Sequence, residues 1–316
     1  MRLSMKGIVM NMRAVKRSKM RRKFIEQIPL FLFILPGIIL VLLFNYIPMT
    51  GLQLAFRDFQ FSGGIWGSPF VGLENFRQFL LSADFWRALK NTAILIPLRL
   101  LVFPAPIVLA LLLNEIRNFK FKRTVQTISY LPHFVSWVVI VGIMDILLSI
   151  DSGAVNSLIK FLGGKPIPFM GMESWFRPLY IISGVWKEIG WGSILYLAAI
   201  SNINPELYEA AEMDGAGRLG KMWYITLPGM VPIISIVLVL SMPGLLSAGM
   251  DQILQMQNPA NMGVTEVIDT FVVRLGIGRA QYSITTAIGL VMSVFSTTLL
   301  LVSNNLSKLL GGEGIW

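Results

Sequence analysis

The segment EAAEMDGAGRLGKMWYITLP, Glu209–Pro228, decides how the rest of the chain is interpreted, because it is polar, punctuated by glycines and flanked by two strongly apolar runs. Just before it, Asn204 and Pro205 are a typical helix N-cap and first helical residue, and Glu206 adds negative charge where the helix dipole favours it. The pattern predicts a short helix from Pro205 to about Asp214, ended by the glycines that follow. An ordered helix between two apolar runs indicates docking to another protein. A plain connector with a chance helix is the alternative.

The composition points to a membrane protein. Of the 316 residues, 54% are hydrophobic and only 14% are charged, and the mean hydropathy is +0.67. The net charge of +10 could suggest nucleic acid, but the basic residues gather at one end and beside apolar runs, without any nucleic-acid-binding motif. We therefore expect membrane lipid, and no nucleic acid, as a partner.

Side chains for catalysis or metal binding are scarce. Cysteine is absent, which excludes a disulfide framework, a thiol nucleophile and a cysteine-based metal site. The single histidine, His133, cannot form a HExxH pair and is interpreted as an interfacial or packed side chain. We expect no catalytic residue, no metal site and no cofactor bound by this chain.

Six apolar runs are long enough to cross a bilayer as helices. They are predicted at residues 28–48, 89–113, 127–148, 179–200, 228–249 and 283–306. Between the first two, residues 49–86 are expected to form an external loop that is rich in aromatic residues and contains a short helix through 73–81.

Charge asymmetry sets the expected orientation in the membrane. Residues 1–23 hold nine basic side chains and no acidic one, within a basic tail that we expect at residues 1–27. The 114–126 loop is also basic, so the positive-inside rule places it in the cytoplasm together with the amino terminus, the 201–227 loop and the 307–316 tail.

The quoted segment carries a resemblance to a known family. Its pattern is Glu209, Ala210, Ala211, three residues, Gly215, nine residues, Ile225, one residue, Leu227 and Pro228. This pattern resembles the EAA loop of the permeases of binding-protein-dependent ABC importers. Met222 departs from it by an apolar exchange, since many members carry phenylalanine there. The segment FNYIPMTGLQLAFRDF and the aromatic loop around it further resemble the subgroup that imports complex oligosaccharides, which includes the permease of the alginate importer.

The resemblance implies a fold and a set of partners. The fold would be an all-α polytopic membrane protein of six transmembrane helices, the type I ABC importer permease fold, with residues 87–306 as the core and a cytosolic coupling helix within 201–227. The partners would be a second homologous permease, two cytosolic ATPase subunits that use ATP and Mg²⁺, and an extracytoplasmic solute-binding protein that delivers an oligosaccharide. The location would be the bacterial cytoplasmic (inner) membrane. Because the chain has no G-x-x-x-x-G-K-[ST] segment, energy has to come from another subunit.

The resemblance also implies residues for coupling to the ATPases. These are Glu209, Ala210, Ala211, Asp214, Gly215, Ala216 and Gly217. In this interpretation Glu209 pairs with a basic residue of the ATPase, the alanines pack at the contact and Gly215 makes the bend.

Ionisable and aromatic residues within the predicted spans are candidates for a substrate pathway. They are Arg99, Asp145, Trp186, Lys187, Glu188 and Trp191. A charge that faces lipid at mid-membrane depth costs about 3 kcal/mol or more, so each charged group should face the protein interior, a partner or water. Two interpretations stay open: the charges pair between helices, or Arg99 and Lys187 line the pathway and favour a polar or anionic sugar.

Two other classes of protein are alternatives. A self-powered secondary transporter would need a coupling-ion site and usually internal repeats, and no convincing repeat is visible. An intramembrane enzyme would need a catalytic constellation, but the sequence around Ser247 lacks the G-x-S-x-G spacing.

Overall fold

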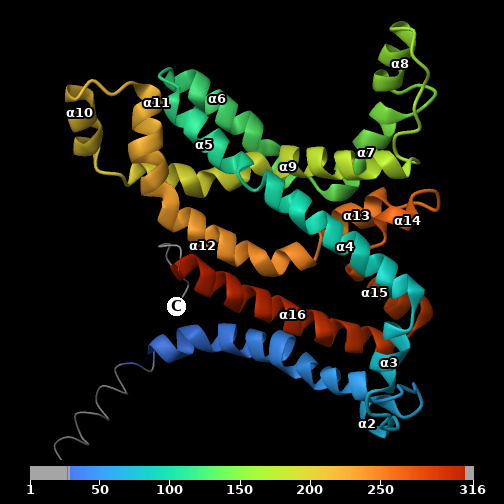
Figure 1. Cartoon of the computed structure of the whole chain (residues 1–316). Helices are drawn as coiled ribbons and strands as arrows, with labels where there is room; N and C mark the ends of the chain where they lie inside the picture. Colours follow the sequence, from blue (N-terminus) through green and yellow to red (C-terminus); the bar gives the residue numbers. More distant parts are fainter. Residues whose placement is uncertain (1–26, 28, 310–316) are drawn as a thin grey trace, which may run out of the picture.

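The computed structural model describes residues 27 and 29–309, and this part of the chain is helical without any named β-strand (Figure 1). After the first helix, Pro29–Phe56, which ends in η1 (Leu42–Tyr46) and η2 (Ile47–Phe56), come α2 (Gly64–Gly67), α3 (Glu74–Leu80), α4 (Ala83–Val102), α5 (Ala105–Glu115), α6 (Phe119–Tyr130), η3 (Leu131–Phe134), α7 (Trp137–Leu148), α8 (Ala154–Phe161), α9 (Glu173–Ser201), α10 (Pro205–Met213), α11 (Arg218–Lys221), η4 (Met222–Thr226), α12 (Leu227–Leu246), α13 (Met250–Met256), α14 (Met262–Thr265), α15 (Ile268–Arg279) and α16 (Tyr282–Leu309). The predicted all-α class is confirmed.

Among the described residues, four continuous helical stretches are long and apolar enough to cross a membrane. They are Pro29–Phe56, Ala83–Glu115, Arg218–Leu246 and Tyr282–Leu309. Helix α9 has 29 residues but is less apolar than these four stretches, because Lys187 and Glu188 lie at its middle. Its length, about 43 Å at the usual rise per residue, is nevertheless ample for a span. The six-span count therefore stays a prediction.

The predicted span 127–148 is not one straight helix. Helix α6 with η3 and helix α7 are separated by a short break and their axes differ by 102°. The cause is local, because Pro132 lacks an N–H donor and Val135 and Ser136 are both extended, with ψ angles of 133° and 154°. With this bent pair counted as one span, five stretches are long and apolar enough.

Several helix ends differ from the sequence-based bounds. The first helix runs on to Phe56, into the segment expected as a loop, while α3 confirms a short helix inside that loop. The fifth apolar helix already begins at Arg218, because α11, η4 and α12 follow one another without an interruption. The predicted tail at 1–27 lies almost wholly outside the described residues, as does most of the tail at 307–316.

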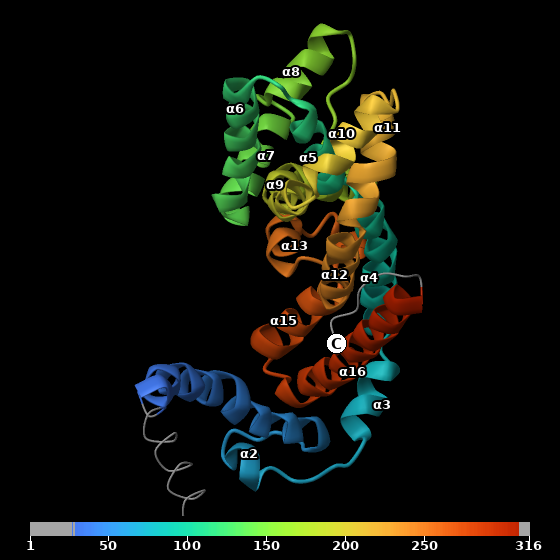
Figure 2. The same cartoon turned by 90° about the vertical axis from the view of Figure 1, so that its left-hand side faces the viewer.

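Helix α9 is the central element, and Figure 2 shows it end-on. It packs against α5, α6 and α12, and buried apolar clusters lie along these contacts. One cluster joins α5, α9 and α12 through Ala110, Tyr196 and Met230, and a second joins α4, α7, α9 and α13 around Phe176. A third joins α4, α15 and α16 at the end of the molecule that carries α3. The apolar part of the first helix is left uncovered by the rest of the chain.

Candidate functional site

The loop between α9 and α12 folds as the segment Glu209–Pro228 predicts. The Asn204 side chain caps α10 by accepting a hydrogen bond of 3.0 Å from the Glu206 N–H, and Pro205 opens the helix. At the other end Gly215 adopts a φ of +77°, which lets the Ala216 N–H reach back 2.8 Å to the Ala211 carbonyl. The predicted end of the helix at about Asp214 is confirmed, since α10 ends at Met213.

Not every glycine of this loop breaks the helix. Gly217 is the N-cap of α11, with an extended backbone, but Gly220 lies inside α11. The loop is held to itself by two side-chain contacts: Tyr208 and Thr226 approach to 2.9 Å between their hydroxyls, and Lys221 donates to Glu212 at 2.7 Å. This hydrogen bond, together with the positive charge of Lys221, lowers the pKa of the Glu212 carboxyl.

Most predicted coupling residues lie on the surface of this loop. Glu209, Ala210, Asp214, Gly215 and Gly217 are exposed, and Ala211 and Ala216 are half-buried. Two large apolar side chains of α10, Leu207 and Met213, are exposed on the same helix. Exposed apolar side chains gathered beside polar ones are typical of a protein interaction site.

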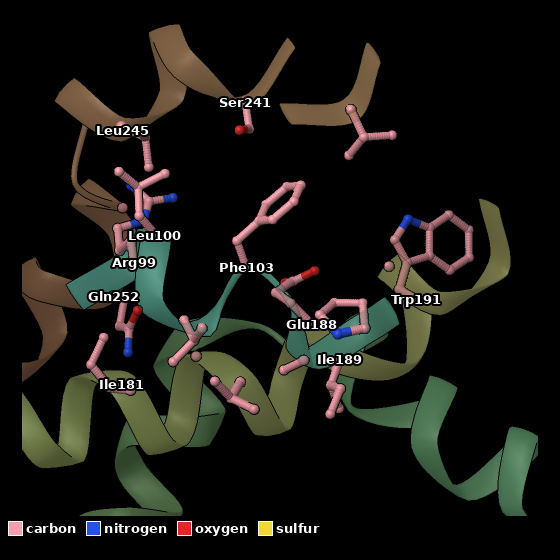
Figure 3. Close-up of a pocket in the computed structure, with 18 of the residues that line it drawn as sticks. Arg99, Leu100, Phe103, Ile181, Glu188, Ile189, Trp191, Ser241, Leu245 and Gln252 are labelled. Atoms are coloured by element: carbon pink, nitrogen blue, oxygen red, sulfur yellow. The ribbon is translucent and has the colours of Figure 1, made fainter. Parts of the chain in front are cut away.

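The second candidate site is a cavity of about 590 Å³ at the junction of α4 and α5. It is bounded by these two helices, by α9, by α12 and by residues before and in α13 (Figure 3). Helix α4 ends at Val102 and α5 begins at Ala105, and Phe103 between them lines this space. Arg99 and Trp191 lie on opposite sides of this space, with Glu188 between them (Figure 3).

Three of the predicted pathway residues line the cavity. Arg99 donates a hydrogen bond of 2.8 Å to the Gly244 carbonyl and ties α4 to α12. Glu188 accepts a charge-assisted or neutral hydrogen bond from His133 across 2.8 Å, and the His133 ring stacks on Trp191 with ring centroids 4.5 Å apart. The cavity wall thus combines a guanidinium, a carboxylate and an indole face, which are groups that bind polar ligands and sugar rings.

The other three predicted pathway residues lie elsewhere. Lys187 is buried and donates to backbone carbonyls at the break between η3 and α7. Trp186 is about half-exposed on another face of α9, and Asp145 is exposed on α7. None of these three borders the cavity beside Arg99.

Sequence reasoning missed two polar residues of the cavity. The Gln252 side chain in α13 donates to the Tyr180 carbonyl at 2.7 Å and to the Ser183 hydroxyl at 2.9 Å, and the Tyr180 hydroxyl donates to the Ala248 carbonyl at 2.7 Å. These bonds seat the short helix α13 against α9. A usable signal is the polar residue Gln252 three residues after Gly249, because Gly249 has a φ of +69° and turns the chain back.

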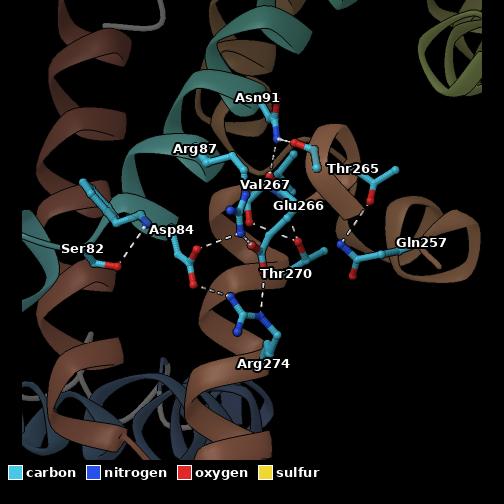
Figure 4. Close-up of polar contacts among 12 residues, drawn as sticks. Ser82, Asp84, Arg87, Asn91, Gln257, Thr265, Glu266, Val267, Thr270 and Arg274 are labelled. Carbon is cyan, nitrogen blue, oxygen red and sulfur yellow. Dashed lines mark hydrogen bonds and ion pairs between the residues drawn. The ribbon is translucent and has the colours of Figure 1, made fainter. Parts of the chain in front are cut away.

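A network of four charged residues was also missed. Glu266, with its side chain 1% exposed, is bound by Arg87 at 3.0 Å and by Arg274 at 2.6 Å, and Asp84 contacts both arginines (Figure 4). The network joins the start of α4 to α15. No group of three or more His, Asp or Glu side chains within the described ranges is placed to hold a metal ion.

Comparison with known proteins places this architecture in a family. Residues 102–311 match the model of the binding-protein-dependent transport system inner membrane component. The chain is 46% identical over 302 residues to the polygalacturonan/rhamnogalacturonan transport system permease protein YteP of Bacillus subtilis, which covers 95% of this chain and 94% of that protein. It is 43% identical over 288 residues to the protein LplB of the same organism, with 91% of each chain covered.

Two solved structures have the same fold over nearly the whole chain. One is a bacterial alginate ABC transporter in complex with an alginate pentasaccharide-bound periplasmic protein, at 39% identity and a TM-score of 0.86, covering 93% of this chain and 99% of that one. The other is a bacterial ABC transporter involved in the import of the acidic polysaccharide alginate, at 40% identity, a TM-score of 0.86 and 92% and 98% coverage. The predicted resemblance to the alginate importer subgroup is confirmed. The chain belongs to the family of binding-protein-dependent transport system inner membrane components and has the type I ABC importer permease fold.

Proposed function

We propose that this chain is one transmembrane subunit of an ATP-driven importer that carries an oligosaccharide across the bacterial inner membrane. The observation that carries the proposal is the exposed, capped helix α10 together with a largely apolar cavity that holds a few polar side chains. The full-length similarity to a polygalacturonan/rhamnogalacturonan permease and to alginate transporter chains supports a sugar polymer fragment as cargo. Family membership favours this function over a self-powered secondary transporter or an intramembrane enzyme.

The partners would be those of a heteromeric importer. We expect a second homologous permease, two cytosolic ATPases that use ATP and Mg²⁺, and an extracytoplasmic solute-binding protein. A periplasmic protein carrying an alginate pentasaccharide is present in one structural relative, which supports the last of these partners. The positive-inside rule supports a multi-pass orientation with both termini and the α10 loop in the cytoplasm.

The α10 loop would transmit ATP-driven motion to the spans. Its exposed face, built on Glu209, Ala210 and Asp214, would lie in a groove of an ATPase subunit, and Leu207 and Met213 would be covered there. Beyond the turn at 214–217, α11, η4 and α12 are continuous, and α10 is tied to them by the Tyr208–Thr226 and Lys221–Glu212 contacts. A movement of α10 would therefore reach α12, which borders the cavity, through these contacts.

The substitution Gly215→Asp tests this coupling. At a φ of +77° any side chain is strained by about 1 kcal/mol, and the new carboxylate would stand on the proposed contact face. The variant should reach the membrane in normal amount, measured by immunoblot, and lose at least about tenfold in substrate-stimulated ATP hydrolysis and uptake by the assembled importer.

Gly163→Asp is a matched control for this strain. Gly163 also has a positive φ, +81°, with open space around it, but it lies after α8, far from α10. Both variants carry the same strain and the same new charge, so only the position differs. Normal coupling in Gly215→Asp, or an equal loss in both, would refute the assignment of α10 to the ATPase contact.

We further propose that the cargo is acidic, such as a uronide. Arg99 provides the cationic side chain among the residues that line the cavity, and one of its terminal nitrogens is committed to Gly244 while the others remain available to a carboxylate. Arg99→Gln keeps a donor for Gly244 but removes the charge. It should raise the half-saturating concentration of an acidic oligosaccharide about tenfold and leave that of a neutral one of equal length unchanged. An equal effect on both sugars would contradict an acidic cargo.

A further inference from the structure

The break between α6 and α7 leaves the His133 and Val135 carbonyls without a backbone donor, whereas the Pro132 carbonyl accepts from the Val135 N–H at 3.1 Å. In a continuous helix the Val139 N–H would bind the Val135 carbonyl, but here it donates to the Ser136 hydroxyl at 3.4 Å. Unpaired carbonyls are costly inside a membrane, where no bulk water can replace the lost bonds. The 102° bend therefore needs a donor from another element.

The ammonium group of Lys187 on α9 supplies that donor. It donates to the carbonyls of Pro132 at 3.3 Å, His133 at 2.5 Å and Val135 at 2.6 Å. An ammonium has three protons, so each has one carbonyl acceptor. The indole of Trp137 lies 5.6 Å away and covers the charge with its π face.

Close packing of α9 on α6 keeps Lys187 within reach of the break. Gly190 is one turn further along α9, and a Cβ atom added there would overlap the Ser129 carbonyl at the end of α6. The two backbones are thus in direct contact. Lys187 is 6% exposed, and although it borders a second cavity with Asp251 and Gln255, its three protons are already used by the carbonyls.

His133 connects the hydrogen bonds of Lys187 at the break with the wall of the cavity beside Arg99. Its carbonyl accepts from Lys187, while its ring stacks on Trp191 with an angle of 2° between the ring planes and its Nδ1 lies 2.8 Å from Glu188. Trp191 and Glu188 both line the cavity beside Arg99. The backbone position of His133 therefore sets where its ring meets these two side chains of α9.

We propose that Lys187 is a positioning residue: by clamping the break between η3 and α7 it holds the His133 ring against Trp191 and Glu188, and so shapes the wall of the cavity. The lysine does not need to touch the cargo. This proposal gives a role to the charge of Lys187 in the middle of α9, although Lys187 does not line the cavity beside Arg99.

The single histidine of the chain makes this proposal measurable without transport. The full chain, purified with an affinity tag free of histidine and placed in lipid nanodiscs, can be labelled with ¹³C and ¹⁵N at histidine alone. Stacking on Trp191 shifts the ring-proton resonances of His133 upfield by ring current. Lys187→Met should lose about half or more of this upfield shift, whereas Lys187→Arg, which keeps cationic donors, should retain most of it.

Lys160→Met is the matched control. Lys160 also donates to two backbone carbonyls, those of Ile150 and Asp151, but it is an exposed residue of α8, far from the cavity. His133 resonances unchanged in Lys187→Met, or changed equally in Lys160→Met, would overturn the proposal. Should Lys187→Met not fold, Lys187→Gln replaces it, and an unchanged His133 spectrum in that folded variant would overturn the proposal as well.

A second measurement connects the clamp to transport and rests on the proposed function. In the assembled importer, Lys187→Met should raise the oligosaccharide concentration for half-maximal ATP hydrolysis about tenfold, with a smaller change in the maximal rate, and Lys187→Arg should restore it in part. The sugar response of the importer and the His133 spectrum can contradict the two proposals independently. An importer that does not respond to sugar at all would contradict the proposed function, while an unchanged half-maximal concentration alongside a changed His133 spectrum would limit the role of Lys187 to the fold.

Discussion

The two ends of the molecule hold acidic side chains in opposite ways. Near α10, Glu212 pairs with Lys221 only nine residues away, and its side chain is 76% exposed. At the opposite end, Glu266 pairs with Arg87 across 179 residues of sequence and is 1% exposed. An exposed local pair shapes its own loop and contributes little stability, whereas a buried long-range pair joins helices and is costly to break. The first arrangement suits a surface that a partner contacts, and the second suits a framework.

The largest expected effect comes from Glu266→Gln. The substitution removes the carboxylate that both Arg87 and Arg274 contact, and Asp84 alone cannot replace it at the buried position. We expect a loss of about 2–3 kcal/mol in the free energy of unfolding, toward the low end for a broken buried pair because both arginines remain partly exposed. Thermal unfolding in nanodiscs measures this loss.

Glu212→Gln is the counterpart at the other end. It also removes one carboxylate from an ion pair, of 2.7 Å, but both water and salt already screen that pair. The unfolding midpoint should not change measurably. Equal shifts in the two variants would remove the distinction between the exposed loop and the buried framework.

The same contrast explains what could be predicted from the sequence. Asn204, Pro205 and Gly215 act on neighbours within a few residues, so the bounds of α10 and its exit turn were predictable from spacing alone. The apolar runs likewise indicated where long helices form, because bilayer thickness fixes their length.

Contacts between distant segments could not be predicted in this way. Nothing near Lys187 in the sequence indicates that its acceptors are 52 to 55 residues away, at a break of another helix. A proline such as Pro132 favours a kink by itself, but nothing near it in the sequence indicates a bend of 102° or the close approach of Gly190 to Ser129. The assignment of Arg99, Glu188 and Trp191 to one cavity, and of Lys187 to the clamp, required the packing of the helices.

A substitution of Asp269 in α15, at the same end of the molecule as Glu266, should change the stability less than Glu266→Gln does and in the opposite direction. Desolvation by burial raises the pKa of this carboxyl from 3.8 to about 6, whereas Lys221 lowers the pKa of Glu212 at the exposed end. The folded chain therefore holds the Asp269 proton more tightly than the unfolded chain. Its contribution to stability is fully present below about pH 4, declines as the pH rises to about 6 and stays lost above that value. Glu212 behaves in the opposite way, because its small contribution is present above its usual pKa of 4.5 and is lost at lower pH.

Asp269→Asn should therefore stabilise the protein at neutral pH. The full pKa difference would correspond to about 3 kcal/mol, and solvent around the half-buried carboxyl reduces the expected gain to about 1 kcal/mol. At about pH 4 the variant and the parent should unfold at the same temperature, since Asp269 is then protonated in the folded chain. Unfolding midpoints of both proteins in nanodiscs across this pH range test the sign directly. A variant that is destabilised at neutral pH would mean that the Asp269 carboxylate has a favourable partner in the folded chain, and that burial there costs nothing.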